Sequence, residues 1–157
     1  MSSPSPSRSF LRLTDPDRLP ATCARPVVAI GNFDGVHRGH RFLFDQAQAL
    51  AASLGRPAMA LTFDPHPRAF FQPGQPQFRL TPPDVQAGLI AGTGLDGLLT
   101  LTFNAALAAQ PAEAFITDLL LARLGIAGVV VGADFHFGKG RGGTPASLAA
   151  AGAAQGF

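Results

Sequence analysis

The most informative segment of this chain is Val27-Val-Ala-Ile-Gly-Asn-Phe-Asp-Gly-Val-His-Arg-Gly-His-Arg41. Its first four residues form a continuous apolar run, which predicts a short buried strand over 27–30. A polar turn with glycines follows, and from about Arg38 apolar residues recur at helical spacing, at Leu43, Ala47, Leu50, Ala51 and Leu54. A strand, a glycine loop and a helix N-terminus direct unpaired backbone N–H groups and the positive end of a helix dipole at the loop. This arrangement favours a bound phosphate.

Two histidines, His37 and His40, lie three residues apart at the expected helix start and therefore point the same way. Imidazoles in this place can donate hydrogen bonds to phosphate oxygens and stabilise charge during phosphoryl or nucleotidyl transfer. Gly39 between them leaves room for a ligand to approach the backbone. The pair alone is equally typical of two surface histidines on a helix. It could also be half of a zinc site, but no cysteine or glutamate lies nearby to complete one.

The composition predicts one compact domain. The chain has 157 residues, of which 46% are hydrophobic and 14% charged, enough to bury a single core. The net charge is +2, the arginines are scattered and Lys139 is the only lysine, so we expect no nucleic-acid partner. Cys23 is the only cysteine, which excludes an internal disulfide and fits a reducing compartment.

The ends and the hydropathy of the chain predict its location. Residues 1–9 are rich in Ser and Pro and lack the apolar region of a signal peptide, so we expect a disordered tail there and a folded domain over 10–157. The chain has no apolar run of ~18 residues, so we expect no membrane partner. These features predict a cytoplasmic protein.

Strands and helices alternate along the sequence. Besides 27–30, apolar runs predict strands over 10–13, 57–63, 95–103 and 126–132. Helical patterns cover 38–54, 81–90 with Thr81 as the N-cap, 111–124, and a last helix capped by Thr144, while 68–80 reads as a loop. Because the strands are continuous apolar runs, we expect an α/β domain with a doubly wound parallel sheet covered on both faces. All four histidines lie in loops that leave strands, at the sheet edge where ligands bind.

The segment Gly31-Asn-Phe-Asp-Gly-Val-His-Arg-Gly-His40 resembles the signature of bacterial bifunctional riboflavin kinase/FMN adenylyltransferases, also called FAD synthetases. His37-Arg-Gly-His40 alone indicates only the wider His-x-Gly-His nucleotidyltransferase superfamily, which has a Rossmann-like fold. The resemblance implies transfer of AMP from ATP to FMN, giving FAD and pyrophosphate, with His37 and His40 as the catalytic residues. It implies that ATP is bound by Gly31, Asn32, Phe33, Asp34, Gly35, Gly39, His66, Asp134 and Arg141.

Two later loops extend the resemblance. Phe63-Asp-Pro-His-Pro67 resembles a Phe-x-Pro-His-Pro element of the family, although taken alone it is typical of an ordinary proline-rich turn. Gly132-Ala-Asp-Phe-His-Phe-Gly-Lys-Gly-Arg-Gly-Gly143 resembles the family's Gly-x-Asp-Phe-x-Phe-Gly-x-x-Arg-x-Gly, with His136 where arginine is common. The resemblance implies flavin contacts from Phe63, Asp64, Pro65, Pro67, Phe135 and Phe137. At least one of the last two phenylalanines is equally explained as core.

In the family this module continues into another strand, a Ser/Thr-rich loop and a β-barrel riboflavin kinase domain. We therefore expect residues 10–157 to be a C-terminally incomplete adenylyltransferase domain that lacks the kinase domain in cis. The resemblance implies Mg²⁺ with the triphosphate, held mainly by nucleotide oxygens and waters. Two alternatives stay open: a His-x-Gly-His nucleotidyltransferase with another phosphorylated acceptor, and an inactive fragment that binds nucleotide or flavin.

Overall fold

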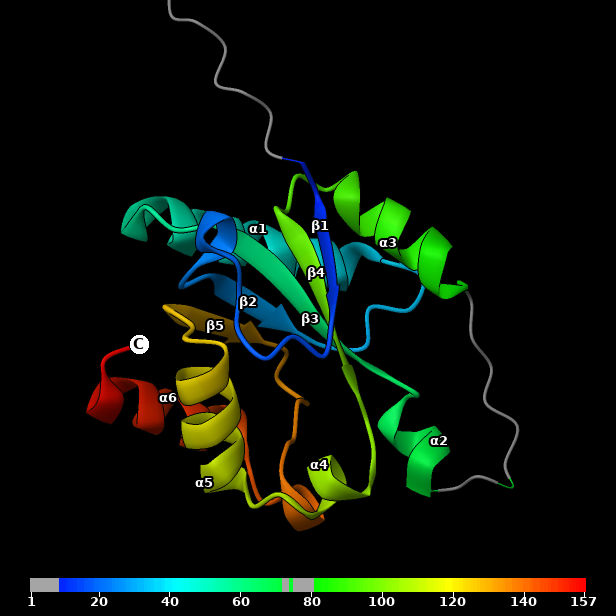
Figure 1. Cartoon of the computed structure of the whole chain (residues 1–157), viewed down its shortest axis with the longest axis vertical. Helices are drawn as coiled ribbons and strands as arrows, with labels where there is room; N and C mark the ends of the chain where they lie inside the picture. Colours follow the sequence, from blue (N-terminus) through cyan, green and yellow to red (C-terminus); the bar gives the residue numbers. More distant parts are fainter. Residues whose placement is uncertain (1–8, 72–73, 75–80) are drawn as a thin grey trace, which may run out of the picture.

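A computed structural model describes residues 9–71, 74 and 81–157. These residues form a five-stranded, all-parallel sheet with the order β1-β4-β3-β2-β5 (Figure 1). The strands are β1 (Leu11–Thr14), β2 (Val27–Ile30), β3 (Ala58–Asp64), β4 (Gly97–Thr102) and β5 (Gly128–Val131). Each lies within a few residues of its expected range, so the prediction of a parallel sheet is confirmed.

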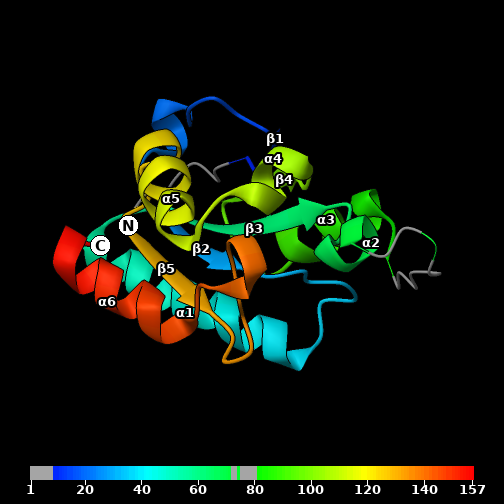
Figure 2. The same cartoon turned by 90° about the horizontal axis from the view of Figure 1, so that it is seen from below.

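Helices cover both faces of the sheet, as expected for a doubly wound domain. They are α1 (Arg38–Leu54), α2 (Pro67–Phe71), α3 (Pro83–Ala91), α4 (Ala105–Ala109), α5 (Ala112–Ala114) with its π-helical continuation η2 (Phe115–Arg123), and α6 (Pro145–Gln155). Two short 3₁₀ turns, η1 (Ala21–Cys23) and η3 (Lys139–Arg141), complete the described elements. Figure 2 shows α1 and α5 on opposite sides of the sheet. None of the described helices is long and apolar enough to cross a membrane.

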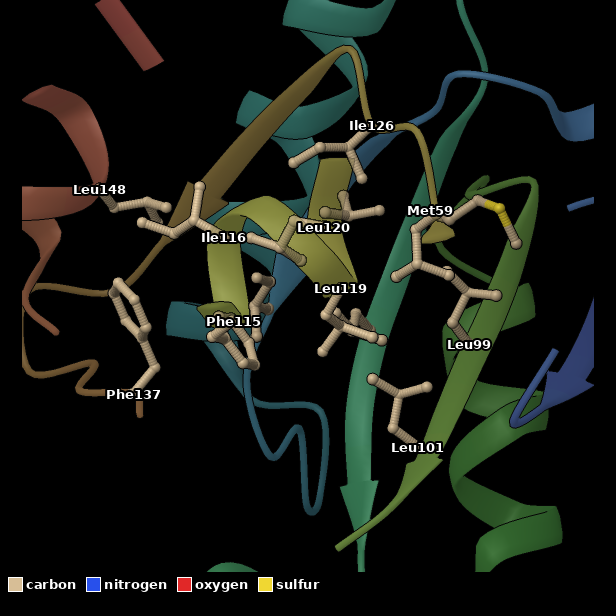
Figure 3. Packing of buried hydrophobic residues seen from close by; sticks show 14 of the residues in the cluster. Met59, Leu99, Leu101, Phe115, Ile116, Leu119, Leu120, Ile126, Phe137 and Leu148 are labelled. Carbon is tan, nitrogen blue, oxygen red and sulfur yellow. The ribbon is translucent and has the colours of Figure 1, made fainter. Parts of the chain in front are cut away.

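The strands divide the core into two layers, since alternate residues of a strand point to opposite faces. Met59 and Leu61 of β3 pack with Leu99 and Leu101 of β4 beneath η2 (Figure 3). Ala58 and Ala60 face α1 and α3 on the other side, where small residues let the helices approach closely. Burial on both faces is the physical reason why the strands read as continuous apolar runs.

The order of the strands indicates at which edge of the sheet a ligand would bind. From β2 the chain moves to β3 and then β4 on one side, whereas β5 pairs with the other side of β2. This reversal makes a topological switch point between β2 and β5, and crevices of this kind open outside the carboxyl ends of the strands. Ile30 pairs with both Leu61 and Val131, so the loops after β2 and β5 start at the same level of the sheet.

Several expectations about the helices are corrected. Helix α1 buries Phe44, Ala47 and Ala51, but Leu50 and Leu54 are 36% and 48% exposed, so the expected apolar face was only partly right. The buried stripe is rotated toward Phe44, because that residue meets the loop before the helix. Thr81 is not a helix cap: α3 has Pro82 at its N-cap without a side-chain cap bond.

Short helices were not expected from the sequence. Residues 67–71 form α2 at the start of the expected loop 68–80, and α4 escaped prediction because its five residues, AALAA, have no polar face. The helix expected over 111–124 is present, with η2 in π-helical geometry. Residues 1–8 of the tail expected over 1–9, and residues 72–73 and 75–80 of the loop expected over 68–80, lie outside the described residues.

Candidate functional site

The first loop (residues 31–37) leaves β2 in an unusual backbone conformation. Phe33, Gly35 and Val36 have φ angles of 55°, 79° and 46°, a region that non-glycine residues seldom occupy. Phe33 is fully buried, and its ring packs edge-on against His40 and Phe44 with centroid distances of 5.2 and 4.7 Å. A Cβ at Gly31 would lie 2.9 Å from this ring, so only glycine leaves room for it. The loop is thus built around a phenylalanine that supports His40 from below.

The two histidines form a capping box at the start of α1. The backbone N–H of Gly39 donates to Nδ1 of His37 over 3.1 Å, and the N–H of His37 donates to Nδ1 of His40 over 3.3 Å. An imidazole nitrogen that accepts a hydrogen bond carries no proton, so each neutral ring keeps its proton on Nε2. The rings stack with centroids 3.6 Å apart. Since Nδ1 of each ring is used by the backbone, Nε2–H is the donor that each ring retains for a ligand.

The surroundings of His40 favour its neutral form. Burial first, and then the neighbouring His37, lower the pKa of His40 from 6.5 to about 4, while Asp34 acts in the opposite direction. A desolvated imidazole loses more from becoming charged than an exposed one, which is the cause of the first effect. At neutral pH His40 is consequently a neutral hydrogen-bond donor.

The first turn of α1 is poor in negative charge. It contains Arg38 and Arg41 but no acidic residue. Cations at a helix N-terminus oppose the helix dipole, whereas an anion placed there is stabilised by both the dipole and the arginines. The local sequence therefore suits a helix start that receives a negatively charged ligand.

Asn32 and Asp34 of the predicted ATP site are engaged in holding the first loop. The backbone carbonyl of Asn32 accepts hydrogen bonds from side chains of β3 and α3. Oδ1 of Asp34 accepts two bonds of 2.9 Å from the backbone N–H and the hydroxyl of Thr81. Gly35 donates its N–H to the same hydroxyl over 3.3 Å. These contacts give both residues a structural role in addition to any ligand contact.

The second loop (residues 65–66) follows β3, beside the first. Asp64 and Pro65 are exposed, and His66 and Pro67 are half-buried. The peptide bond between Asp64 and Pro65 is cis. The backbone carbonyl of His66 accepts the first hydrogen bond of α2, from the N–H of Phe70 over 3.2 Å. The predicted residues of this loop therefore reach the same carboxyl edge of the sheet as the histidine pair.

An aromatic cluster beside the second loop was not predicted from the sequence. Phe103 lies after β4, and its ring is 5.4 Å from Phe70, 5.8 Å from Phe71 and 6.1 Å from Phe63. Phe71 is 63% exposed, so part of the cluster faces solvent. The sequence does show a strand that ends at Phe103, but nothing in it indicates that α2 brings two further rings to that point.

The third loop (residues 132–144) follows β5. Its Asp134 and Arg141 are exposed, Phe135 is half-buried and Phe137 is buried against Phe115, with ring centroids 5.1 Å apart. Phe137 and Gly143 exchange backbone hydrogen bonds of 3.2 and 2.8 Å. Phe137 is therefore a core residue that anchors the loop. Asp134, Phe135 and Arg141 are accessible enough to contact a ligand.

The glycines of the third loop serve its own folding. A Cβ at Gly138, whose φ is 78°, would lie 2.6 Å from the backbone of Ala112, and one at Gly143 would overlap the ring of Phe137. Helix α6 then begins at Pro145, capped by the Thr144 side chain as expected. Gly138 and Gly143 are therefore explained by packing within the protein.

The described residues form no metal cluster, and two cavities of the structure are lined by residues outside the predicted site. Among residues 9–71, 74 and 81–157, no group of three His, Cys, Asp or Glu side chains is placed to hold a metal ion. Two cavities of about 480 Å³ each, one between α1, β5 and α6 and one beside the end of β4, are lined by none of the predicted site residues. The candidate site is therefore defined by the three loops at the carboxyl edge of the sheet.

Known proteins resemble this chain over most of its length. The bifunctional riboflavin kinase/FMN adenylyltransferases of Pseudomonas fluorescens and Escherichia coli strain K12 are 42% and 40% identical to it over 131 residues. Each alignment covers 83% of this chain and 42% of the relative, so the chain spans less than half the length of these curated relatives. A putative bifunctional riboflavin kinase/FMN adenylyltransferase of Geobacillus thermodenitrificans is 39% identical over 122 residues, which are 78% of this chain and 65% of that protein.

A solved structure shares the fold. The crystal structure described as a macrolide-efflux protein from Streptococcus pneumoniae matches with a TM-score of 0.75 and 23% identity, over 90% of this chain and 55% of that one. At this low identity, the match supports a shared fold and nothing further. The family model described as FAD synthetase matches residues 20–157, a range that contains all three loops. This chain therefore belongs to the FAD synthetase family.

Proposed function

We propose that this domain is an FMN adenylyltransferase, which transfers AMP from ATP to FMN and releases pyrophosphate. The observation that carries the proposal is the capping box of His37 and His40, which leaves two Nε2–H donors at the N-terminus of α1. Family membership and the relatives' FMN adenylyltransferase name support the choice of reaction.

In the proposed reaction an oxygen of the FMN phosphate attacks the α-phosphorus of ATP. The new P–O bond forms as the bond between the α-phosphorus and the bridging oxygen breaks, and pyrophosphate leaves with the negative charge. His37 and His40 donate Nε2–H hydrogen bonds to the phosphate oxygens on which charge accumulates. Their role is electrostatic, because donors already fixed by the helix start need no reorganisation during the reaction.

The neutral state of His40 suits this role. A neutral imidazole with a fixed N–H can donate to the phosphate oxygens without the tight ground-state binding of the triphosphate that a cationic imidazole would add. The lowered pKa of His40 keeps it neutral through the physiological range. Phe33 beneath the ring and the hydrogen bond to Nδ1 fix the direction of the donor.

The flavin half of FMN is assigned to the aromatic surface beside the second loop. The isoalloxazine ring is planar and apolar on its faces, and aromatic side chains stack on such surfaces. Phe63, Phe71 and Phe103 gather after β3 and β4, and Phe135 follows β5 at the same carboxyl edge of the sheet. Asp64, Pro65 and Pro67 are proposed to border this surface, with His66 directed to the nucleotide.

Arg141 and Asp134 of the third loop are proposed to contact ATP. Both are exposed, and an arginine can donate two parallel hydrogen bonds to a phosphate group. Gly31, Gly35 and Gly39 contribute by letting the phosphates approach the backbone. We assign Mg²⁺ to the triphosphate itself, since the donor set of the described residues does not make a protein metal site.

The test is a turnover assay with purified protein, ATP, Mg²⁺ and FMN, in which FAD is separated by chromatography. FAD formation above that of a His37→Ala/His40→Ala control establishes the activity. Pyrophosphate release with other phosphorylated acceptors, but not with FMN, would instead assign the domain to a different His-x-Gly-His nucleotidyltransferase. Saturable ATP or FMN binding without product would assign a binding fragment.

The same assay with riboflavin in place of FMN tests the domain assignment. We propose that residues 10–157 belong to the adenylyltransferase module, so we expect them not to phosphorylate riboflavin. FMN produced from riboflavin and ATP would contradict that assignment.

A further inference from the structure

The polar side chains that are buried in the described part of the chain all serve one loop. They are Thr62, Thr81 and Gln86, which are 3%, 9% and 3% exposed. They come from β3, from the residue ahead of α3 and from α3 itself. Each makes a hydrogen bond to residues 32–35 of the first loop. A buried polar group is costly unless it is paired, so their common partner calls for a physical explanation.

Thr62 and Gln86 converge on a single carbonyl. Oγ1 of Thr62 donates to the backbone oxygen of Asn32 over 3.1 Å, and Nε2 of Gln86 donates to the same oxygen over 2.8 Å. Thr62 shares the face of β3 with Ala58 and Ala60, beneath α1 and α3, which is why its hydroxyl meets Gln86 from the helix above. The carbonyl of Asn32 lies beyond the end of β2, where none of the described neighbouring strands supplies a backbone donor. The side chains of Thr62 and Gln86 supply the hydrogen bonds instead.

Thr81 secures the next residues of the loop. It donates its backbone N–H and its hydroxyl to Oδ1 of Asp34, each over 2.9 Å, and its hydroxyl oxygen accepts from the N–H of Gly35 over 3.3 Å. The first loop is thereby held at two points, at Asn32 by Gln86 of α3 and at Asp34 by Thr81 ahead of that helix. Hydrogen bonds at two positions fix the orientation of the first loop, whereas bonds at one position would let the loop rotate.

The conformation that these bonds hold is costly for the chain. Phe33 and Val36 both have positive φ angles, which cost roughly 1–2 kcal/mol per non-glycine residue. Strained backbone of this kind persists only where surrounding contacts determine it. Val36 is followed directly by His37, the N-cap whose backbone N–H holds Nδ1 of His40. Any rotation of residues 32–36 therefore redirects both histidines.

We propose that Thr62, Thr81 and Gln86 are positioning residues, which lock the first loop so that His37, His40 and the N-terminal N–H groups of α1 face the same phosphate. This inference rests on the proposed function for its kinetic consequence. The inference also predicts a change in the titration of His40, which can be measured without any enzymatic activity. The inference and the proposed function can therefore be refuted separately.

The first experiment compares Gln86→Met with Gln48→Met. Gln48 is a matched control, because its Nε2 also donates to a backbone carbonyl of another element, that of Thr93 over 3.2 Å, outside the predicted site. Each substitution removes a hydrogen bond from a side-chain amide to a backbone carbonyl and preserves the length of the side chain. A displacement of catalytic groups by about 1 Å can lower turnover up to ~10²-fold, so we expect Gln86→Met to lower kcat at least ~10-fold. KM for FMN should change little, and Gln48→Met should retain kcat within ~3-fold.

The second experiment follows the imidazole of His40 by NMR titration in the absence of substrates. In the parent protein the pKa of His40 lies at about 4 because the ring is partly buried against Phe33 and beside His37. A loosened loop exposes the ring, so in Gln86→Met the pKa of His40 should rise toward 6.5, and in Gln48→Met it should remain at the parent value.

Thr62 supplies a milder pair of variants in case Gln86→Met does not fold. Thr62→Val keeps the shape of the side chain and removes the hydroxyl, while Thr62→Ser keeps the hydroxyl. We expect Thr62→Val to lower kcat and raise the pKa of His40, and Thr62→Ser to restore both. An unchanged His40 titration in the folded Gln86→Met and Thr62→Val proteins would overturn the inference. So would an equal loss of kcat in Gln48→Met, which would indicate general destabilisation. If no protein makes FAD, the titration alone decides.

Discussion

The first and third loops leave neighbouring strands at the same level, yet they are held in different ways. The first loop is fixed by buried side chains, Phe33 from within and Thr62, Thr81 and Gln86 from outside. The third loop is held by the buried ring of Phe137 and by backbone-to-backbone bonds, such as those between Phe137 and Gly143 and from the N–H of Lys139 to the carbonyl of Gln110. Its charged side chains, Asp134 and Arg141 among them, are exposed.

This contrast suggests a division of tasks at one site. Stabilising a transition state requires donors whose direction is set before the substrate arrives, and the first loop has this property. Binding a flexible triphosphate can use exposed side chains that take up their final positions with the ligand, and the third loop offers these. Substitutions in the two loops should therefore differ both in the size of their effects and in the kinetic constant that they change.

The largest effect is expected from His40→Ala. The variant loses one fixed donor to the reacting phosphates, so turnover of FMN and ATP to FAD should fall ~10²-fold or more. The matched change in the third loop is His136→Ala, at an exposed histidine, where we expect turnover within a few-fold of the parent. A comparable loss of turnover in both variants would contradict the proposed division of tasks between the two loops.

The second prediction concerns the glycines that shape the third loop. Gly138→Ala places a Cβ 2.6 Å from the backbone of Ala112 at a φ of 78°, and should lower the free energy of unfolding by about 3 kcal/mol. Gly140→Ala is a control with a φ of 65° but no atom within 4 Å, so strain alone should cost about 1 kcal/mol. Urea titrations of both proteins measure the difference. Equal losses would mean that the packing of Gly138 against Ala112 is not what fixes the loop.

A smaller and different effect is expected from Arg141→Gln. Loss of a charged hydrogen bond to phosphate is worth about 1.5–3 kcal/mol, so KM for ATP should rise ~10-fold or more while kcat changes little. Arg56→Gln, ahead of β3 at the opposite edge of the sheet, serves as the control and should leave KM for ATP unchanged. A fall in kcat with constant KM would instead place Arg141 among the groups that act on the transition state.

The smallest effect is the pH dependence of stability that His40 contributes. Its pKa is about 4 in the folded protein and 6.5 for an unperturbed histidine, so between these values the unfolded chain binds a proton that the folded protein does not. Stability from this source is therefore present above pH 6.5 and is lost as the pH falls toward 4. Because the ring is half-exposed, we expect no more than about 1 kcal/mol.

Urea titrations of the parent and of His40→Gln, at about pH 7.5 and about pH 5, measure this contribution. The parent should lose more stability than the variant between the two conditions. An equal loss in both proteins would mean that the burial of His40 against the first loop does not determine its protonation.

Local sequence was sufficient to predict the strands, the longer helices and the histidine pair. Continuous apolar runs such as 27–30 are typical of strands buried on both faces, and Thr144 followed by Pro145 marks a helix start by local chemistry alone. His37 and His40 share a helix turn whatever surrounds them. These features depend on residues a few positions apart, so periodicity and short motifs reveal them.

The way in which the first loop is held, and the aromatic rings that gather beside the second loop, depend on the tertiary structure. Thr62, Thr81 and Gln86 lie 30, 47 and 54 residues from the atoms that they bond, and Thr81 read locally as a helix cap. Phe103 meets Phe70 and Phe71 only because α2 turns back over the end of β4. Such contacts follow from the strand order, since β3 lies between β2 and β4 and brings their loops together. Local sequence cannot specify them, because the energy of each contact depends on where the whole sheet places both partners.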